Sequence, residues 1–561
     1  MNIRKVTYII LFILLMFISL TNVNASNYGV RVNSDGTLSL NGKYFKAMGL
    51  NDVDLVWDEG KYTDSDFEIL SNNKIPFIRV AFGGWWPKVY GWYYEDPDKY
   101  FKITDAIIKK AEEKEVGIII DFFWNNQSFF YYHKNQRSDM GNPNSKSVIE
   151  AKKFVDKIIN RYKDSPAVWG YEIGNEYNLA VDLYRPDSGI RFTITKDDPS
   201  ADITKDYFTT NELSVFYTEI ASEIRFLDSD RFITTGDAAA RKHSYSLYSA
   251  TKDIYFNNHK SWKENWSVTT NYKDMISKLN PNPVNTISTH LYTGYFKSGG
   301  SISGGTFDEY LKIYIDKAKE MKKGLYVGEF DGPCSSASDG GKSAIKAIKN
   351  SSIQLSSPWL AGSDGRLLKV SCTTANKSEF EELIKNDIYN YNKEYQSVFD
   401  SAWNSWKKTI KVNSNNASYT ITKSNNYTTN AKSDYYLEKD TIKLTVTPKS
   451  GYKVKSISVK TTSGNTVKYS NNQFIMPNGD VVINISTEKI ESNKPSDTKI
   501  DDSKSEIVTP AEEEKEEVIE EQSEYYKIKD REFIIQVSIA VGILVILLLL
   551  FELFTKNKKD E

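Results

Sequence analysis

The feature that most constrains the fold of this chain is a series of short apolar stretches that alternate with amphipathic ones. Strands that are apolar throughout are typical of a parallel sheet covered by helices on its outer face. The amphipathic stretches, such as Tyr100–Glu115, Ser147–Tyr162 and Glu212–Leu227, predict those helices. Eight strands are expected, at Phe45–Leu50, Ile75–Phe82, Val116–Phe123, Val168–Ile173, Arg231–Thr235, Val284–Thr289, Leu325–Phe330 and Ile353–Leu360.

Eight strand–helix units favour an α/β fold of the (β/α)8 type, a TIM barrel. An open, doubly wound sheet is the alternative. The sequence shows no glycine-rich phosphate loop after the first expected strand, which favours the barrel. The barrel domain is expected to span residues 26–411, a normal length for this fold.

After residue 411 the helical periodicity stops, and a small all-β module is expected at residues 412–490. Alternating apolar residues predict its strands, and turn residues such as Asn478-Gly479 separate them. Its segments Gly451–Val454 and Phe474–Val481 resemble the divergent B-repeat of bacterial internalin-type surface proteins. The resemblance implies a spacer or adhesive module that makes contacts at a cell surface.

The N-terminal residues predict export. Residues 1–25 combine Arg4 and Lys5, an apolar stretch and a small residue, Ala25, before the expected cleavage point. This order is typical of a secretory signal peptide, and an uncleaved N-terminal anchor is the alternative.

The C-terminal residues predict attachment to the membrane. Residues 491–532 are polar and acidic, which indicates a disordered stalk or, alternatively, a binding tail. No charged residue occurs in Phe533–Phe551, so residues 533–554 are expected to form a single transmembrane helix. The basic tail at 555–561 is expected in the cytoplasm. The chain is therefore predicted to be a single-pass protein of the cell membrane whose barrel domain is extracellular.

Composition narrows the range of partners. The net charge is −2 without a block of Lys or Arg, so no nucleic-acid partner is expected. Aromatic residues make up 13% of the chain, and their faces can stack on sugar rings. The four histidines lack the spacing of metal ligands, and neither a metal nor another cofactor is expected.

Cys334 and Cys372 are the only cysteines. Export would permit a disulfide between them, and the sequence leaves open whether it forms.

Two glutamates stand at the ends of expected strands. Glu176 follows the fourth strand in the run Tyr171–Glu176, and Glu329 ends the seventh in the run Tyr326–Phe330. In a barrel, the C-terminal ends of the strands surround the active site. Glycosidic cleavage needs two carboxyl groups, one to protonate the leaving oxygen and one to attack or stabilise the anomeric carbon. A salt bridge at the barrel rim is the alternative for either glutamate alone.

These motifs resemble those of glycoside hydrolase family 5, the cellulase and mannanase type, over most of residues 27–410. The resemblance implies that Glu176 is the general acid/base and Glu329 the nucleophile. It also implies a set of substrate-binding or supporting positions. These are Arg79, Asn175, His290, Tyr292 and Trp359, to which Trp124 is added from the sequence itself.

Each supporting residue has an expected task. Arg79 should keep Glu329 ionised, because a nearby guanidinium lowers the pKa of a carboxyl group. Tyr292 can hydrogen-bond the same carboxylate, and Asn175 matches the family's contact to the substrate 2-hydroxyl. His290 either binds a hydroxyl or positions Glu176, with a purely structural role as the alternative.

The third strand departs from the family pattern. Many members carry a histidine just after this strand, where the present sequence reads Asp121-Phe122-Phe123-Trp124-Asn125. Trp124 is therefore expected to be a stacking platform in place of that histidine, or else an ordinary buried aromatic residue.

The sequence thus predicts a retaining glycoside hydrolase that cleaves the O-glycosidic bonds of a β-linked polysaccharide or oligosaccharide, cellulase- or mannanase-like, at the cell surface. Its partner is the carbohydrate substrate, and the identity of the sugar stays open. A catalytically inactive, carbohydrate-binding adhesin is the alternative from another class of protein.

Overall fold

The computed structural model describes residues 28–83, 87–182, 207–241, 244–249, 268–296, 304–332, 341–359, 382–424 and 436–490. The expected signal peptide, stalk, transmembrane helix and tail lie outside these residues, as do Cys334 and Cys372. Among the described residues, no helix has the length and apolar character that a membrane span requires.

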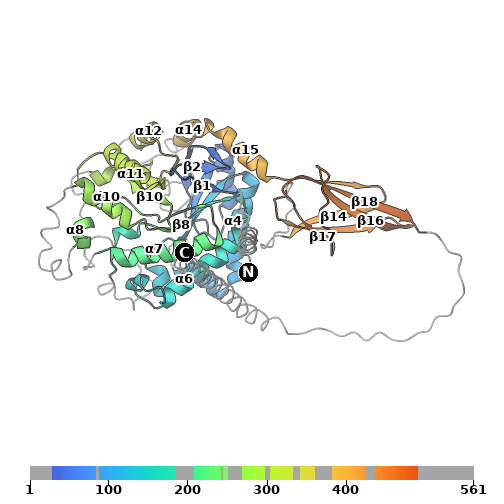
Figure 1. Ribbon diagram of the computed structural model, residues 1–561, viewed down its shortest axis with the longest axis horizontal. Helices are drawn as coiled ribbons and strands as arrows, with labels where there is room; N and C mark the ends of the chain where they lie inside the picture. Colours follow the sequence, from blue (N-terminus) through green and yellow to red (C-terminus); the bar gives the residue numbers. More distant parts are fainter. Residues whose placement is uncertain are drawn as a thin grey trace, which may run out of the picture. The chain divides into compact units, whose positions relative to one another are not determined.

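The expected (β/α)8 barrel is confirmed (Figure 1). Its parallel strands form two sheets, in the orders β5-β6-β7-β8-β9 and β10-β11-β12-β4. The strands are β4 (Ala47–Met48), β5 (Leu50–Asn51), β6 (Phe77–Ala81), β7 (Gly117–Phe123), β8 (Val168–Gly174), β9 (Phe232–Thr234), β10 (Thr286–Leu291), β11 (Gly324–Phe330) and β12 (Leu355–Ser356). Each lies in or overlaps an expected strand, and the expected first strand is divided at Gly49 into β4 and β5.

Helices follow the barrel strands and cover the sheet from outside (Figure 1). The longer ones are α2 (Thr63–Asn72), α3 (Pro87–Glu95), α4 (Pro97–Lys114), α6 (Lys146–Tyr162), α7 (Thr210–Leu227), α10 (Val268–Lys278), α11 (Phe307–Met321), α12 (Lys342–Asn350) and α15 (Gln396–Trp406). Shorter ones are α5 (Ser128–Tyr132), α8 (Ser244–Ser249), α14 (Tyr389–Lys393), η1 (Arg137–Gly141), η2 (Tyr177–Leu179), η4 (Thr293–Phe296) and the π-helix η5 (Leu383–Ile388). A small antiparallel sheet of β1 (Val30–Val32), β2 (Leu38–Leu40) and β3 (Lys43–Tyr44) precedes the barrel.

Helix α4 shows how the sequence sets these elements. The side chain of Asp96 accepts a hydrogen bond from Lys99 N at 3.1 Å and caps the helix. Pro97 is the first helical residue, a position at which the missing N–H of proline costs no hydrogen bond within the helix. Ile103, Ile107 and Ala111 recur at helical spacing and are buried against the barrel. The helix ends where Glu115 adopts a left-handed conformation, with φ 59°.

The inside of the barrel has an aromatic part and a polar part. Phe77 stacks on Trp169 with ring centroids 5.7 Å apart, and a Cβ at Gly117 would overlap the same indole. Two residues farther along β6, Arg79 is fully buried, and the carboxyl groups of Asp121 and Glu172 are buried beside it. Buried charges need partners, and Arg79 forms ion pairs with both of these carboxyl groups.

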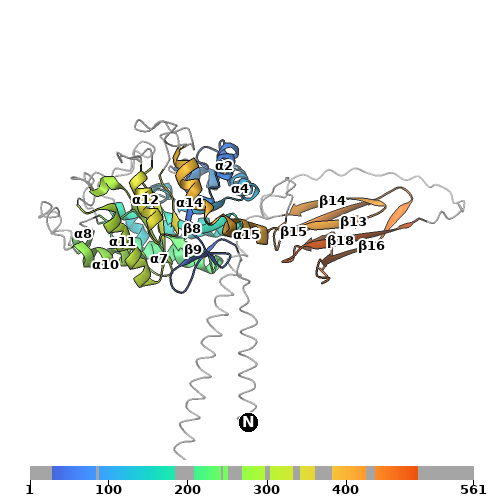
Figure 2. The same cartoon turned by 90° about the horizontal axis from the view of Figure 1, so that it is seen from above.

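The expected all-β module is also confirmed (Figure 2). It consists of the sheets β13-β18-β16 and β14-β15-β17. The strands are β13 (Ile410–Ser414), β14 (Ala417–Ser424), β15 (Thr441–Pro448), β16 (Tyr452–Thr461), β17 (Gln473–Ile475) and β18 (Val481–Lys489). Alternate residues such as Ile442 and Leu444 are buried in a core of their own, while Lys443 between them is exposed.

Asn285 joins the two barrel sheets between β9 and β10. Its main-chain N donates to Ile233 O at 3.2 Å, and its side-chain Oδ1 accepts from Ile233 N at 2.7 Å. Its carbonyl accepts from Gly324 N of β11 at 2.9 Å. The side chain thus replaces a main-chain acceptor that regular strand pairing would supply.

We expect Asn285→Ala to lower the free energy of unfolding by about 1–2 kcal/mol, because Ile233 N loses its acceptor inside the barrel wall. Urea denaturation measures the loss. Asn285→Asp is the matched control, since it keeps an oxygen acceptor in place and should cost clearly less. Equal losses for the two variants would show that this hydrogen bond does not close the barrel.

Candidate active site

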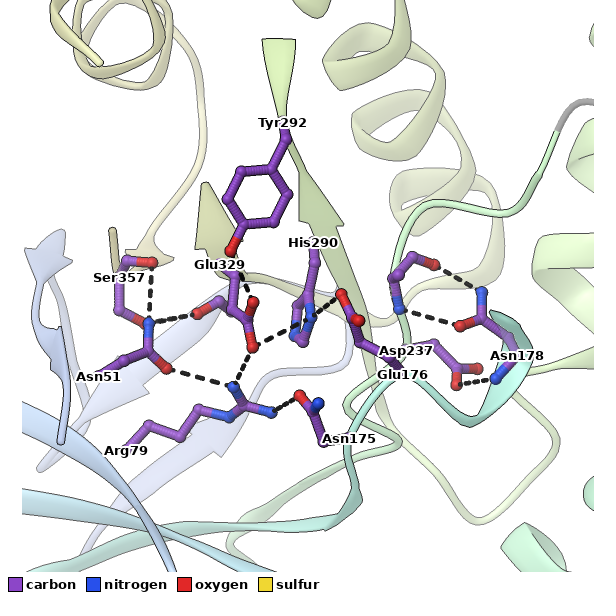
Figure 3. A network of polar contacts seen from close by, with 12 residues as sticks. Asn51, Arg79, Asn175, Glu176, Asn178, Asp237, His290, Tyr292, Glu329 and Ser357 are labelled. Atoms are coloured by element: carbon purple, nitrogen blue, oxygen red, sulfur yellow. Dashed lines mark hydrogen bonds and ion pairs between the residues drawn. The ribbon is translucent and has the colours of Figure 1, made fainter. Parts of the chain in front are cut away.

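The C-terminal ends of four barrel strands bring the expected site residues together (Figure 3). Arg79 lies on β6, and Asn175 and Glu176 directly follow β8. His290 lies on β10, and Glu329 lies on β11. The parallel register places His290 opposite Glu329. Because all four strand ends open on the same rim, residues far apart in the sequence form one cluster.

The two expected catalytic carboxylates face each other across His290. One oxygen of Glu176, one oxygen of Glu329 and a ring nitrogen of His290 all lie within 4.8 Å of one another. His290 Nδ1 is 3.0 Å from Glu176 Oε1 and 3.3 Å from Glu329 Oε1. Such a trio can also hold a cation, but the positive charge of Arg79 already lies against Glu329 and disfavours one there.

Arg79 organises the floor of the site. Its Nη1 donates to Glu329 Oε1 at 2.7 Å, and its Nη2 donates to Asn175 Oδ1 at 2.7 Å. Its Nε forms an ion pair with Glu172, and Nη1 also lies 3.2 Å from Asn51 Oδ1. Four of the five N–H donors of the guanidinium thus have an acceptor, and its rigid fork fixes both the carboxylate and the amide.

Tyr292 completes the surroundings of Glu329. Its hydroxyl donates to Glu329 Oε2 at 2.7 Å, so each oxygen of this carboxylate receives a hydrogen bond. Burial raises the pKa of Tyr292 well above its ordinary value, with the charge of Glu329 as a further cause. The phenol is therefore protonated, and can donate this hydrogen bond, at neutral pH.

Burial gives Glu176 a different character. It raises the pKa of Glu176 to about 7, and the nearby charge of Arg79 offsets part of that effect. Burial also lowers the pKa of His290 to about 3, so the imidazole is neutral near pH 7. Glu176 can therefore exist in both protonation states near neutral pH, beside a neutral histidine.

The two expected tryptophans stack on each other, with ring centroids 6.1 Å apart and an interplanar angle of 26°. Trp124 is only 3% exposed, and its ring lies 4.6 Å from the guanidinium carbon of Arg79. This placement favours the buried-aromatic alternative for Trp124, which covers Arg79 through a cation–π contact. Trp359 is half-buried, so its side chain is more accessible than that of Trp124. Its main-chain N donates a hydrogen bond to Phe330 O at 2.9 Å.

Three further members of the site were not found from the sequence, namely Asn51, Asp121 and Glu172. Asn51 donates through Nδ2 to Gly328 O at 3.0 Å and so ties β5 to the strand that carries Glu329. Asp121 and Glu172 lie opposite each other on β7 and β8, and burial raises the pKa of both. A signal was present, because an acidic residue inside an apolar strand requires a buried partner.

A (β/α)8 barrel with two glutamates converging at its C-terminal rim defines a glycosidase. Residues 38–365 match the model of the cellulase family, glycosyl hydrolase family 5, and the chain belongs to that family. Residues 418–490 match the divergent InlB B-repeat domain. Both resemblances seen in the sequence are therefore confirmed.

The chain is also similar to solved structures, at low identity. The endo-1,4-β-mannanase from Rhizomucor miehei is 16% identical, with a TM-score of 0.46, over 66% of this chain and 99% of its own. The endo-β-1,4-mannanase from Thermotoga petrophila is 15% identical, with a TM-score of 0.42, over 81% of this chain and 99% of its own. A family 5 cellulase from an Icelandic hot spring isolate is 17% identical, with a TM-score of 0.36, over 62% and 84%. No curated protein matches the chain.

We expect the side-chain carboxyl of Glu176 to titrate near pH 7, because burial disfavours its charged form. Carbon-13 NMR of protein labelled at the glutamate δ-carbon measures this titration, and Glu176→Gln identifies the resonance by removing it. A midpoint below pH about 5, close to the ordinary value for glutamate, would contradict the assignment.

Proposed function

We propose that this glycosidase is a retaining enzyme that cleaves β-linked polysaccharides or oligosaccharides by double displacement. The observation that carries the proposal is the close approach of Glu176 and Glu329, whose nearest oxygens lie within 4.8 Å. Retaining enzymes hold their carboxyl groups about 5–5.5 Å apart, whereas inverting enzymes leave about 6.5–9.5 Å for a water molecule. The approach therefore favours direct attack by a carboxylate.

In the first step, Glu329 attacks the anomeric carbon while Glu176 gives its proton to the leaving oxygen. The C–O bond to the leaving sugar breaks, and an ester bond to Glu329 forms. Arg79 and Tyr292 hold the attacking carboxylate in one orientation, through 2.7 Å hydrogen bonds to its two oxygens. In the second step, Glu176 takes a proton from water, and the resulting hydroxide displaces Glu329 from the sugar. A pKa of about 7 suits Glu176 to both roles.

Substrate contacts are proposed for the residues around this pair. Asn175 uses its oxygen to accept from Arg79, and this fixes its Nδ2 in an orientation from which it can donate to the sugar 2-hydroxyl. The accessible ring of Trp359 is suited to stacking on a sugar face. His290 contacts both carboxylates, so we propose that it positions Glu176 rather than binding a hydroxyl. Membership of family 5 supports a cellulase- or mannanase-like enzyme.

A catalytically inactive adhesin is the alternative function. A binding protein has no need of a carboxyl group whose pKa is raised to about 7 beside a second carboxylate held by two donors. The site therefore favours the enzyme. The B-repeat module is compatible with either function, and we propose that it makes contacts at the cell surface.

We further propose that the barrel is held outside the cell by the expected C-terminal helix at residues 533–554. Protease added to intact cells should cleave the expected stalk at residues 491–532 and release an active fragment. Immunoblotting of the medium detects the fragment, and a cytoplasmic protein is the control for intact cells. Full protection of the chain would contradict this topology.

We expect Glu329→Gln and Glu176→Ala to fail in different ways. Without its nucleophile, the Glu329 variant should lose about 10³-fold or more activity on all substrates, because no glycosyl-enzyme can form. The Glu176 variant should keep much of its first-step rate on aryl glycosides with good leaving groups, and added azide should raise its turnover and yield a β-glycosyl azide.

Proton NMR of the first sugar that the wild-type enzyme releases shows whether the anomeric configuration is retained. An inverted anomer would overturn the mechanism.

A further inference from the structure

Glu176 has an unusual backbone conformation. Its φ of 54° and ψ of 30° place it in the left-handed region, which residues with a side chain seldom occupy. Residues stay in this region only where their surroundings force them to. The hydrogen bonds around the turn should therefore reveal what holds the proposed acid/base in place.

The segment that follows β9, residues 235–239, is hydrogen-bonded to the turn that contains Glu176. Glu176 N donates to Gly236 O at 2.9 Å, so the segment runs beside the end of β8. Farther along the same segment, Ala239 N donates to His290 O at 2.9 Å. The segment thus touches both the residue that carries the proposed acid/base and the histidine that contacts it.

Asn178 locks the turn to this segment. Its Nδ2 donates to Ala238 O at 2.7 Å, and its Oδ1 accepts from Ala238 N at 3.1 Å, so one amide side chain serves both main-chain groups. Asn178 N donates to Asp237 Oδ1 at 3.3 Å, and Tyr217 OH donates to the same oxygen at 2.6 Å. All of these side chains are buried, and Asn178 and Asp237 lie beside Glu176 (Figure 3).

We propose that Asn178 is a positioning residue, which holds Glu176 in its left-handed conformation and thereby aims its carboxyl group at the leaving oxygen. Arg79 fixes Glu329 from one side of the site, and Asn178 fixes Glu176 from the other. The role of Asn178 rests on the proposed function of Glu176 as acid/base. It does not depend on the identity of the sugar, because Asn178 acts only through the main chain.

The matched control is Asn392→Ala. The amide of Asn392 makes the same reciprocal pair, accepting from Met48 N at 2.8 Å and donating to Met48 O at 2.9 Å. This pair is equally buried, but it belongs to β4 rather than to the rim segment after β9. Loss of stability should therefore be similar in the two variants, while an effect on Glu176 belongs to Asn178→Ala alone.

The kinetic test compares kcat/KM for a series of aryl β-cellobiosides and β-mannobiosides, from phenyl to dinitrophenyl leaving groups. We expect Asn178→Ala to lose about 10–100-fold on the phenyl glycosides and about threefold or less on the dinitrophenyl ones, because only the former need the proton. Asn392→Ala should change both by the same small factor. An equal loss on all leaving groups, or no loss, would overturn the proposal.

A second readout does not depend on turnover. In the carbon-13 titration, Asn178→Ala should lower the pKa of Glu176 by about one unit or more, since a released side chain becomes better hydrated. An unchanged titration would overturn the positioning role. If the wild-type enzyme cleaves none of the glycosides, the proposed function fails, and this titration still decides whether Asn178 positions Glu176. If Asn178→Ala does not fold, Tyr217→Phe, which weakens the same contact through Asp237, should show both effects to a smaller degree.

Discussion

The arrangement of the active site depends on one buried cation. Arg79 is fully enclosed in the barrel, where an unpaired guanidinium would cost several kcal/mol. The fold meets this constraint with Glu172 and Glu329 as charged partners and with the amide oxygens of Asn51 and Asn175. These partners come from three strands and their ends, β5, β8 and β11, so the contacts of Arg79 also fix how those strands are aligned at the rim.

The same cation distinguishes the two glutamates at the rim. Glu329 accepts a hydrogen bond directly from Arg79 and another from Tyr292, and these bonds fix the orientation of its carboxyl group. Glu176 contacts neutral His290 instead, and burial raises its pKa to about 7. Two residues of one chemical type therefore have different partners within a few ångströms. Of the two, Glu329 accepts a hydrogen bond from the guanidinium, whereas Arg79 acts on Glu176 through its charge alone.

The sequence predicted the strands and the two rim glutamates better than it predicted which buried residues pair with one another. Strand positions followed from apolar runs, because a strand covered on both faces admits few polar residues. Glu176 and Glu329 followed from their places at strand ends. The partners Asp121 and Glu172 did not, because their pairing depends on the register between β7 and β8, which no local pattern encodes. The division of the first strand at Gly49 was also missed, because the apolar run continues through it.

The acidic pair beneath Arg79 bears on how the site tolerates the reaction. In the proposed mechanism Glu329 becomes an ester and loses its negative charge, and Arg79 then loses one of its two close counter-ions. Glu172 remains paired with Nε of Arg79, and Asp121 lies 3.9 Å from Nη2. Burial raises the pKa of Asp121 well above its ordinary value, with the charge of Glu172 as a further cause. Glu172 is therefore the close counter-ion that stays with Arg79 in that state, and its ion pair keeps the guanidinium in place to receive the carboxylate again when the ester is hydrolysed.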